Sequence, residues 1–329
     1  MSQTHQLSRD TFHGEWDPTL PPRLTIASGD SVVFETRDAS NGKVRDRISS
    51  EVLDALPADL RQLIHDYAER YRNDPWTPGH ALTGPVVFDG ASPGDVLQID
   101  VVAIEAATWG WTSFSPGFGL LADEFDYGHV QVWDLRDGRD AELKPGIRVP
   151  LEPFCGVMGV APDVPEPVST LPPRTAGGNM DVKQLTAGST LYLPVQAPGA
   201  LFSAGDAHGA QGDGEVCGAG IEMESITTLR FTLRRDLALT QPRFETFGPL
   251  PGGWNVAGHI ATTGIGPDLF EATREAIRQM IALLVDDFEL SRAEAYVLCS
   301  VAVDLKISEV VDAPNWLVSA FLPKGLFVA

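Results

Sequence analysis

The stretch Pro93-Gly-Asp95-Val-Leu-Gln-Ile-Asp100-Val101 decides the fold, because it sets a glycine turn directly before a strand. Apolar side chains recur at every second position from Leu97, which is the period of a half-buried strand. Two further segments, 28–36 and 187–194, repeat this combination of turn and strand. The alternation returns at residues 229–233. Strands from both halves of the chain are therefore predicted to pack together in a jelly roll or β-sandwich.

Helical periodicity is confined to three segments. One lies early in the chain, at residues 58–71. The clearest covers 267–288, where apolar side chains repeat at helical spacing and predict one buried face. A further helix begins at the capping box Ser291-Arg-Ala-Glu294, which satisfies backbone N–H groups of the first turn. The apolar stripe of the second helix comprises Phe270, Ala276, Ile277, Met280, Ile281 and Leu284.

The length of 329 residues suits one large domain or two fused ones. We expect a single domain over residues 1–329, β-rich from 16 to 240, with a helical block at 264–304 and a C-terminal strand region. Five prolines and two glycines between 161 and 178 predict a long loop. The expected fold class is α+β, predominantly β, with a C-terminal helical block.

The net charge of −21 repels phosphate, so a nucleic-acid partner is not expected. The apolar runs are too short to cross a bilayer, and the first residues lack the pattern of a signal peptide. A disulfide framework cannot be built from Cys155, Cys217 and Cys299 alone, and so few cysteines fit a reducing compartment. We therefore expect a cytoplasmic protein without a membrane partner.

The densest group of polar side chains lies between Ser203 and Gly220. Glycines separate them, which predicts a tightly folded loop that brings polar groups close to a ligand. Carboxylate and imidazole donors on such a loop suit a metal or a hydrolytic site. A glycine-rich hairpin with solvated acids is the alternative interpretation. The side chains concerned are Asp206, His208, Gln211, Asp213 and Glu215.

Four further residues at predicted strand ends or turns are candidates for a functional site. His80 follows glycine at the entry to a strand, where it either faces a cleft or makes structural hydrogen bonds. Asp38 ends another predicted strand and is by itself typical of a turn. Paired glycines before Asn179 and Asp181 place both close to a ligand or, as readily, in an Asx turn.

Nucleophilic catalysis finds little support in the sequence. Cys155 and Cys217 each lie beside glycine, but neither follows a recognisable elbow or a neighbouring base. Buried cysteines without a catalytic role are common, so packing is the favoured interpretation. A G-x-S-x-G elbow and a glycine-rich phosphate loop are both absent from the sequence.

Short motifs distributed in order along almost the whole chain resemble the acetamidase/formamidase family. The loop pattern Gly-Asp-x-His-x-x-Gln of that family is intact from Gly205 to Gln211. The other matching pieces are Trp16-Asp-Pro, Ser28-Gly-Asp30, Asp38-Ala, His80-Ala-Leu-Thr-Gly-Pro85, Pro93-Gly-Asp95, Trp109-Gly-Trp111, Pro116-Gly-Phe-Gly119, Gly156-Val-Met-Gly159, Gly178-Asn-Met-Asp181, Gly199-Ala-Leu-Phe202, Gln211-Gly-Asp-Gly-Glu215 and Asp312-Ala-Pro-Asn-Trp316.

The resemblance implies a β-sandwich-based fold and hydrolysis of a short-chain carboxamide, of the formamide or acetamide type, to its acid and ammonia. It also implies a divalent metal, with zinc preferred and calcium as the alternative. A γ-lactam is the cyclic variant of the same substrate class. Linear amide or lactam stays open at this stage.

An amide is a poor electrophile, so water activated by a metal or a carboxylate is the economical scheme. We assign the metal to Asp38, His80, Asp206 and His208, and proton transfer to Glu215, with Asp206 and His208 as further catalytic groups. Asn179, Asp181 and Gln211 are expected to hold the amide. Backbone N–H groups of Gly177 and Gly178 are expected to stabilise the oxyanion.

Two other functions remain open from the sequence. One is a thiol amidase that uses Cys155 or Cys217 as its nucleophile. The other is a β-sandwich that binds small amides, or calcium, without catalysis. In each case we expect a homodimer or higher homo-oligomer, because Trp316 and the apolar segment 317–322 suit a subunit contact as well as a core.

Overall fold

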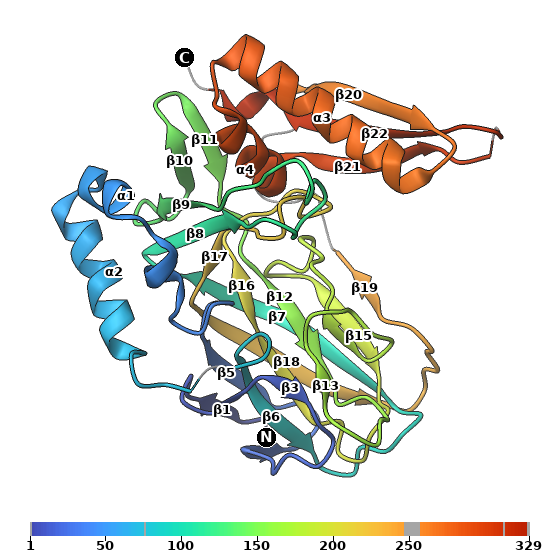
Figure 1. Cartoon of the computed structure of the whole chain (residues 1–329). Coiled ribbons are helices and arrows are strands. Elements are labelled where there is room, and N and C mark those ends of the chain that lie inside the picture. Colours follow the sequence, from blue (N-terminus) through green and yellow to red (C-terminus); the bar gives the residue numbers. More distant parts are fainter. Residues whose placement is uncertain (1, 76, 247–256, 312, 328–329) are drawn as a thin grey trace. The chain divides into compact units, whose positions relative to one another are not determined.

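The computed structural model describes residues 2–75, 77–246, 257–311 and 313–327 (Figure 1). It is 38% strand and 18% helix, which confirms the predominantly β class with a C-terminal helical block. The chain divides into two compact units, each described by itself. The first unit comprises Met1–Ala107, Pro153–His208 and Glu222–Leu250; the second comprises Thr108–Glu152, Gly209–Ile221 and Pro251–Ala329. The single domain expected from the sequence stays a prediction.

A six-stranded sheet in the first unit contains the strands that the turn pattern predicts. Segments 28–36, 93–101 and 187–194 supply three of its members, and 229–233 supplies a fourth. All neighbouring strands are antiparallel except the first pair. In spatial order the strands are β1 (Thr4–Leu7), β5 (Ser31–Thr36), β18 (Ser225–Arg234), β7 (Val96–Ala106), β15 (Thr190–Pro194) and β19 (Arg243–Glu245).

The second group of paired strands in this unit, called here the buried sheet, has little exposure on either face. Every residue of its strands β12 (Phe154–Gly159) and β16 (Phe202–His208) is buried. In spatial order these strands are β14 (Gly177–Asn179), β12, β16 and β17 (Glu222–Met223). The remaining strands are β6 (Leu82–Phe88), which pairs with β16, and β2 (Phe12–His13) and β4 (Leu24–Ile26), which pair with β6.

Four buried phenylalanines join the two sheets. Phe34 of β5 lies edge-on to Phe202 of β16, with ring centroids 5.8 Å apart. Phe231 of β18 contacts Phe202 at 5.0 Å and Phe88 of β6 at 4.9 Å. Tilted and edge-on rings at these separations are the favourable aromatic geometries, and burial of each side chain contributes about 1.5–3 kcal/mol. The two sheets therefore form the β-sandwich that the sequence predicts.

Helices and short strands complete the first unit. The predicted helix at 58–71 is α2 (Ala58–Arg70), preceded by η1 (Val44–Arg47) and the unpredicted α1 (Ser50–Ala55). The proline-rich segment 161–178 is mostly loop, as expected. It also contributes β13 (Val168–Ser169), which pairs with β3 (Glu15–Trp16) and so fixes the middle of the loop.

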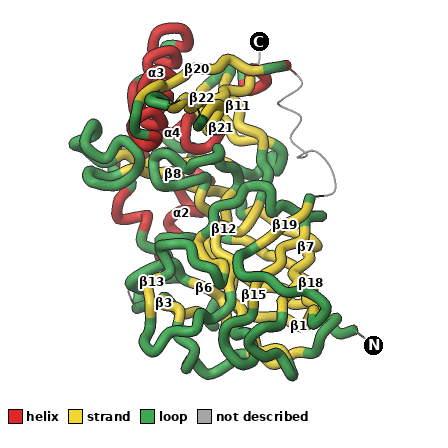
Figure 2. The backbone as a smooth tube through the Cα atoms, turned by 90° about the vertical axis from the view of Figure 1, so that its right-hand side faces the viewer, coloured by secondary structure: helices red, strands yellow, loops and turns green. Residues whose placement is uncertain are grey.

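The second unit carries the helical block. In Figures 1 and 2, α3 (Leu269–Phe288) lies along a three-stranded sheet of order β20 (His259–Gly266), β22 (Trp316–Pro323) and β21 (Asp304–Glu309). The other elements are α4 (Arg292–Ala302), the hairpins β8 (Trp109–Phe114) with β9 (His129–Asp134) and β10 (Asp140–Lys144) with β11 (Ile147–Pro150), and η3 (Lys324–Leu326).

Both predicted helices of this block are present, with one correction. The reciprocal capping box of Ser291 and Glu294 begins α4, as the sequence indicates. Phe270, placed in the apolar stripe of α3, is 59% exposed. Phe270 lies in the first turn of α3. The contact between Gly264 and the helix begins only at Ala272, so it does not cover Phe270. None of the described helices has the length and apolarity required to span a membrane. Asp312, quoted in one of the motifs, lies outside the described residues.

Candidate active site

Asp206 and His208 lie on strand β16, and the expectation that they sit on a loop is wrong. Gly205, which suggested a loop, occurs where a neighbouring strand comes close. A Cβ at this position would lie 2.9 Å from the carbonyl oxygen of Ala81. The loop starts only after the strand ends at His208. Glycine in this stretch therefore reflects tight packing between strands rather than a turn.

Two aspartates of this region have left-handed backbone conformations. Asp206 has φ 54° within β16, and Asp181 has φ 50° just after β14. Residues other than glycine rarely adopt such angles, and the strained conformation persists only where the surrounding structure holds it. Asp206 is held by pairing of β16 with strands on both sides. Strain of this kind gathers at functional sites.

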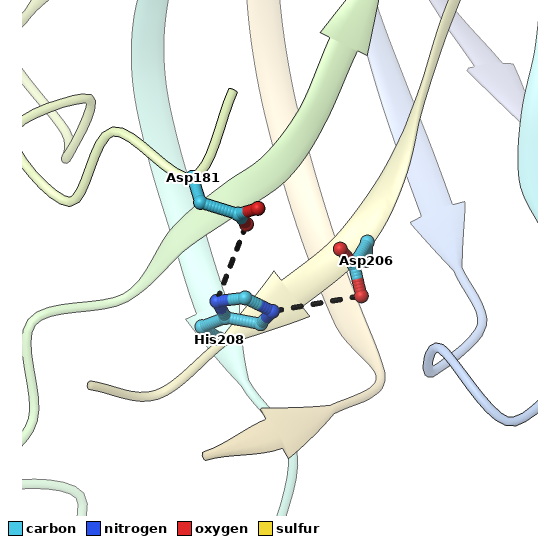
Figure 3. A group of neighbouring side chains, drawn as sticks. All are labelled: Asp181, Asp206 and His208. Carbon is cyan, nitrogen blue, oxygen red and sulfur yellow. Dashed lines mark ion pairs between the residues drawn. The ribbon is translucent and has the colours of Figure 1, made fainter. Parts of the chain in front are cut away.

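A buried histidine, His208, lies among three carboxylates, all in the first unit. Figure 3 draws it with two of them, Asp181 and Asp206. His208 Nε2 is 3.1 Å from Glu222 Oε1 and 3.5 Å from Asp206 Oδ1. On the other side of the ring, Nδ1 lies 4.0 Å from Asp181 Oδ1. His80 approaches the same group, with Nε2 3.7 Å from Asp206 Oδ2. The structure thus brings together four residues from three separate stretches of chain and adds Glu222.

The pKa values of these groups shift in opposite directions. Burial raises the pKa of the Glu222 and Asp181 carboxyls. Burial also opposes ionisation of Asp206, but the imidazoles of His80 and His208 lower its pKa below the ordinary value. For His208, burial lowers the pKa, yet Glu222 and Asp206 outweigh it and raise the pKa well above 6.5. The cluster therefore favours an ionised Asp206, and a metal ion bound by His208 would displace the proton that Glu222 and Asp206 stabilise on its ring.

Gly156 of β12 makes room for two carboxylates to converge. A Cβ on this residue would lie 2.5 Å from Asp181 Oδ1 and 2.9 Å from Asp206 Oδ2. Any larger residue would force one carboxylate away.

The donor set fits a divalent metal ion. Asp181, Asp206 and His208 each offer one ligand atom, and these atoms lie within 4.8 Å of one another. Asp206 Oδ1 is buried and has no hydrogen-bond partner among the described residues. An ion among these atoms would satisfy that oxygen, and two carboxylates with one imidazole are donors that zinc accepts.

Asp38 is engaged elsewhere in the first unit. Its carboxylate accepts hydrogen bonds from the Ser40 hydroxyl at 2.7 Å and from the Gly42 N–H at 3.2 Å. Burial is the main cause of the raised pKa of Tyr67, and the charge of Asp38 is the second. These contacts hold the turn that follows β5. A place for Asp38 among the metal ligands stays a prediction.

Asn179 has one half of its amide hydrogen-bonded and the other half without a partner among the described residues. Its Nδ2 donates to the carbonyl oxygen of Leu171 at 3.0 Å, which fixes the orientation of the side chain. Its Oδ1 is buried and accepts no hydrogen bond from the described residues. The expectation that the backbone N–H of Gly177 stabilises an oxyanion is wrong. This N–H donates to Arg174 O at 3.0 Å and closes a turn.

Gln211 and Glu215 belong to the second unit. Gln211 is buried, whereas Glu215 is half-buried and has φ 44°. The loop that carries both is tied to α4, because Ser300 O accepts from Gly212 N at 2.7 Å and Ser300 Oγ accepts from Cys217 N at 3.1 Å. Their catalytic and binding roles stay predictions.

Glu222 is the site residue that sequence reasoning missed. It stands between Ile221 and Met223, and its exposed fraction is 3%. A single acid between two apolar residues is the available signal, because a carboxylate in a buried strand needs a partner to repay its desolvation. The acid-rich stretch that precedes it drew attention to Glu215 instead.

The cysteines are poor candidates for a nucleophile. Cys155 is 1% exposed, and burial raises the pKa of its thiol to about 11. The Cys217 thiol is fully buried and points to the carbonyl oxygens of Ser113 and Ala219, both at 3.7 Å. A catalytic cysteine requires a stabilised thiolate and access to substrate, and neither environment provides them.

Comparison with known proteins gives a consistent result. A formamidase of Methylophilus methylotrophus is 26% identical over an alignment of 386 positions that covers 96% of this chain and 89% of the formamidase. Among solved structures, a γ-lactamase from Delftia acidovorans superposes with a TM-score of 0.83 at 26% identity, covering 97% of this chain and 90% of the other. An acetamidase from Yersinia enterocolitica gives a TM-score of 0.62 at 32% identity, covering 99% and 93%.

The model of the acetamidase/formamidase family matches this chain in two segments, residues 1–165 and 164–329. Together they span the sequence from end to end. The motifs quoted above, distributed from Trp16 to Trp316, agree with that extent. The protein belongs to the acetamidase/formamidase family.

Proposed function

We propose that this protein hydrolyses a short-chain linear carboxamide, of the formamide or acetamide type, to its carboxylate and ammonia. Family membership across the whole chain supports hydrolysis of a carbon–nitrogen bond outside peptides. The observation that carries the proposal is the cluster of the buried Asp206, His208 and Glu222 with the half-buried Asp181. So many ionisable groups in a sheet interior are costly to desolvate, and catalysis explains why the fold retains them.

A divalent cation, zinc or alternatively calcium, completes the proposed site. Asp181, Asp206 and His208 are the residues placed to hold it, with His80 beside Asp206 and Asp38 as the further ligand predicted from the sequence. When bound, such an ion supplies Lewis acidity and a water of lowered pKa. In this assignment Asp181, predicted from the sequence as a substrate-binding residue, becomes a ligand.

Proton transfer is proposed for one of two glutamates. Cleavage of an amide requires a proton at the departing nitrogen, taken up from the attacking water. Glu222 Oε1 lies 3.1 Å from His208 Nε2, within hydrogen-bond reach, and the two side chains can pass a proton between them. Glu215 is the residue predicted from the sequence. Separate replacement of each by glutamine distinguishes them.

Recognition of the amide is proposed for Asn179. The carboxamide NH₂ group of a substrate needs acceptors, and the buried Asn179 Oδ1 is such an acceptor. Because Nδ2 is fixed by Leu171 O, the acceptor cannot exchange places with the donor. Gln211 is retained as a second predicted contact to the amide.

A γ-lactam is the second candidate substrate. The observation that favours it is the TM-score of 0.83 with the γ-lactamase, against 0.62 with the acetamidase from Yersinia enterocolitica. Opening of a lactam breaks the same acyl–nitrogen bond, but it yields an amino acid and no ammonia. The two substrate classes therefore differ in product.

The proposal is tested with purified protein before and after treatment with a chelator. Ammonia release from formamide and acetamide, and ring opening of a γ-lactam, are measured with zinc or calcium added back. We expect release that the chelator abolishes and the metal restores. Release that resists chelation would move catalysis to the carboxylates alone, and binding without turnover would support the non-catalytic alternative. Glu222→Gln, compared with Glu215→Gln at equal metal content, identifies the proton carrier.

Assembly and location extend the proposal. No disulfide joins the three cysteines, all of which lie in the described part of the chain, and this is consistent with a reducing cytoplasm. A homo-oligomer is proposed from the sequence. Within β22 the side chains of Val318, Ala320 and Leu322 are buried in the chain itself, which leaves the half-buried Trp316, Leu317 and Phe321 for a subunit contact. Sedimentation of the purified protein measures its state directly.

A further inference from the structure

Thr170 makes two polar contacts with His80. The hydroxyl oxygen accepts the backbone N–H of His80 at 2.8 Å and lies 3.2 Å from Nδ1 of the same ring. One hydroxyl thus fixes both the backbone and the side chain of the histidine. The two residues are 90 positions apart in the sequence.

The contact determines which ring nitrogen faces the site. With Nδ1 held by Thr170, the opposite nitrogen Nε2 lies 3.7 Å from Asp206 Oδ2. The His80 side chain is only 12% exposed, so solvent offers the ring few alternative partners. A histidine that serves a reactive or metal-binding group commonly has its second nitrogen fixed in this way.

Thr170 itself is firmly placed. It is fully buried and follows directly after β13, whose residues pair with Glu15 and Trp16 of β3. The next carbonyl oxygen, of Leu171, accepts from Asn179, so one short segment supports two proposed site residues. Gly79 leaves the space that the hydroxyl occupies, because a Cβ there would lie 2.2 Å from Thr170 Oγ1. The hydroxyl has little freedom to move.

We propose that Thr170 is a positioning residue of the active site, which fixes the His80 ring so that Nε2 faces Asp206. The inference rests on the proposed function in one respect, the participation of His80. Because the hydroxyl already accepts the backbone N–H, its proton can be donated to Nδ1, or its second lone pair can accept a proton from Nδ1. Thr170 therefore holds the ring in either tautomer, which leaves Nε2 as a donor to Asp206 or as a lone pair for a ligand.

The experiment compares Thr170→Val with Thr170→Ser in the full chain, using kcat and KM for formamide and acetamide. Valine keeps the shape and removes the hydroxyl, whereas serine keeps the hydroxyl. We expect Thr170→Val to lower kcat by about 10–100-fold with little change in KM, the usual cost of removing such a partner, and Thr170→Ser to stay near wild type. Equal activity of the valine and wild-type proteins would overturn the proposal.

His80→Gln separates this outcome from failure of the proposed function. If His80→Gln keeps full activity, His80 has no part in catalysis and the positioning proposal fails with it, while the cluster of Asp206, His208 and Glu222 that carries the proposed function stands. If His80→Gln is inactive while Thr170→Val is unaffected, the site stands and only the positioning role fails.

Should Thr170→Val not fold, long-range ¹H–¹⁵N spectra of histidine-labelled wild-type protein test the same point. A His80 ring that exchanges freely between orientations would contradict the proposal, and a single fixed ring would support it.

Discussion

The two sheets of the first unit differ in how their strands are buried. Strand β5 of the six-stranded sheet alternates between buried and half-buried residues, whereas β12 and β16 of the buried sheet are buried throughout. Charged groups on the first sheet pair near solvent, as Arg230 and Asp100 do at 2.8 Å. In the buried sheet, Asp206 and His208 lie in the interior.

This difference separates two kinds of ion pair. An exposed pair is screened by water and contributes little to stability. A buried pair has large electrostatic effects because water does not screen it, but its desolvation is costly. The shifted pKa values of Asp206 and His208 are the result of that environment. The same fold therefore holds one sheet that organises the sandwich and another that can do chemistry.

Replacement of one aspartate in each sheet is the strongest test of whether the two sheets differ in function. Asp206→Asn removes the charge between His80 and His208, so we expect ammonia release to fall to background. Asp100→Asn is the matched control, and it should retain wild-type turnover because Arg230 has a 56% exposed side chain. The assay is ammonia release from acetamide at equal protein concentration, with metal content measured for both. Activity in Asp206→Asn would contradict the site.

The same contrast explains what could be predicted from the sequence. Strands β5 and β7 of the six-stranded sheet can be recognised by alternation, as at Leu97, Ile99 and Val101, because one face is less buried than the other. A strand buried on both faces has no such period. Strand β16 therefore resembled a loop, since Gly205 and the polar Asp206 and His208 suggested exposure.

The candidate site was predicted in part for a related reason. Asp206, His208 and His80 occur in motifs, and the structure brings them together. The signal at Glu222 is weak, one acid between two apolar residues, and Thr170 has no local signal, because each contacts a partner far along the chain or across a sheet. Pairing of strands, which local sequence does not reveal, is what places them.

Strand β18 has one buried and one exposed face, so the effect of burial on stability can be compared within a single strand. Phe231 is fully buried between the two sheets, whereas Ile226 on the same strand is 37% exposed. We expect Phe231→Ala to lower the free energy of unfolding by about 3–5 kcal/mol, because it leaves a cavity among the phenylalanines. Ile226→Ala should change it by roughly 0.5 kcal/mol or less, as surface substitutions usually do. Chemical denaturation measures both, and similar values would show that the two faces of this sheet are not energetically distinct.

His13 of β2 tests the buried sheet through the pH dependence of stability. Burial lowers the pKa of its imidazole to about 4, and its Nε2 lies 2.8 Å from the Ser203 hydroxyl. The unfolded chain, with a pKa near 6.5, binds a proton before the folded protein does. The contribution of His13 to stability is therefore complete above about pH 6.5 and declines as the pH falls toward 4, by about 3 kcal/mol in total. In urea denaturation at a series of pH values, His13→Gln should lose stability less steeply over this window than the wild type. An identical slope in the two proteins would mean that His13 accepts its proton as readily in the folded state, and that the half-buried surroundings of its ring beside Ser203 are hydrated.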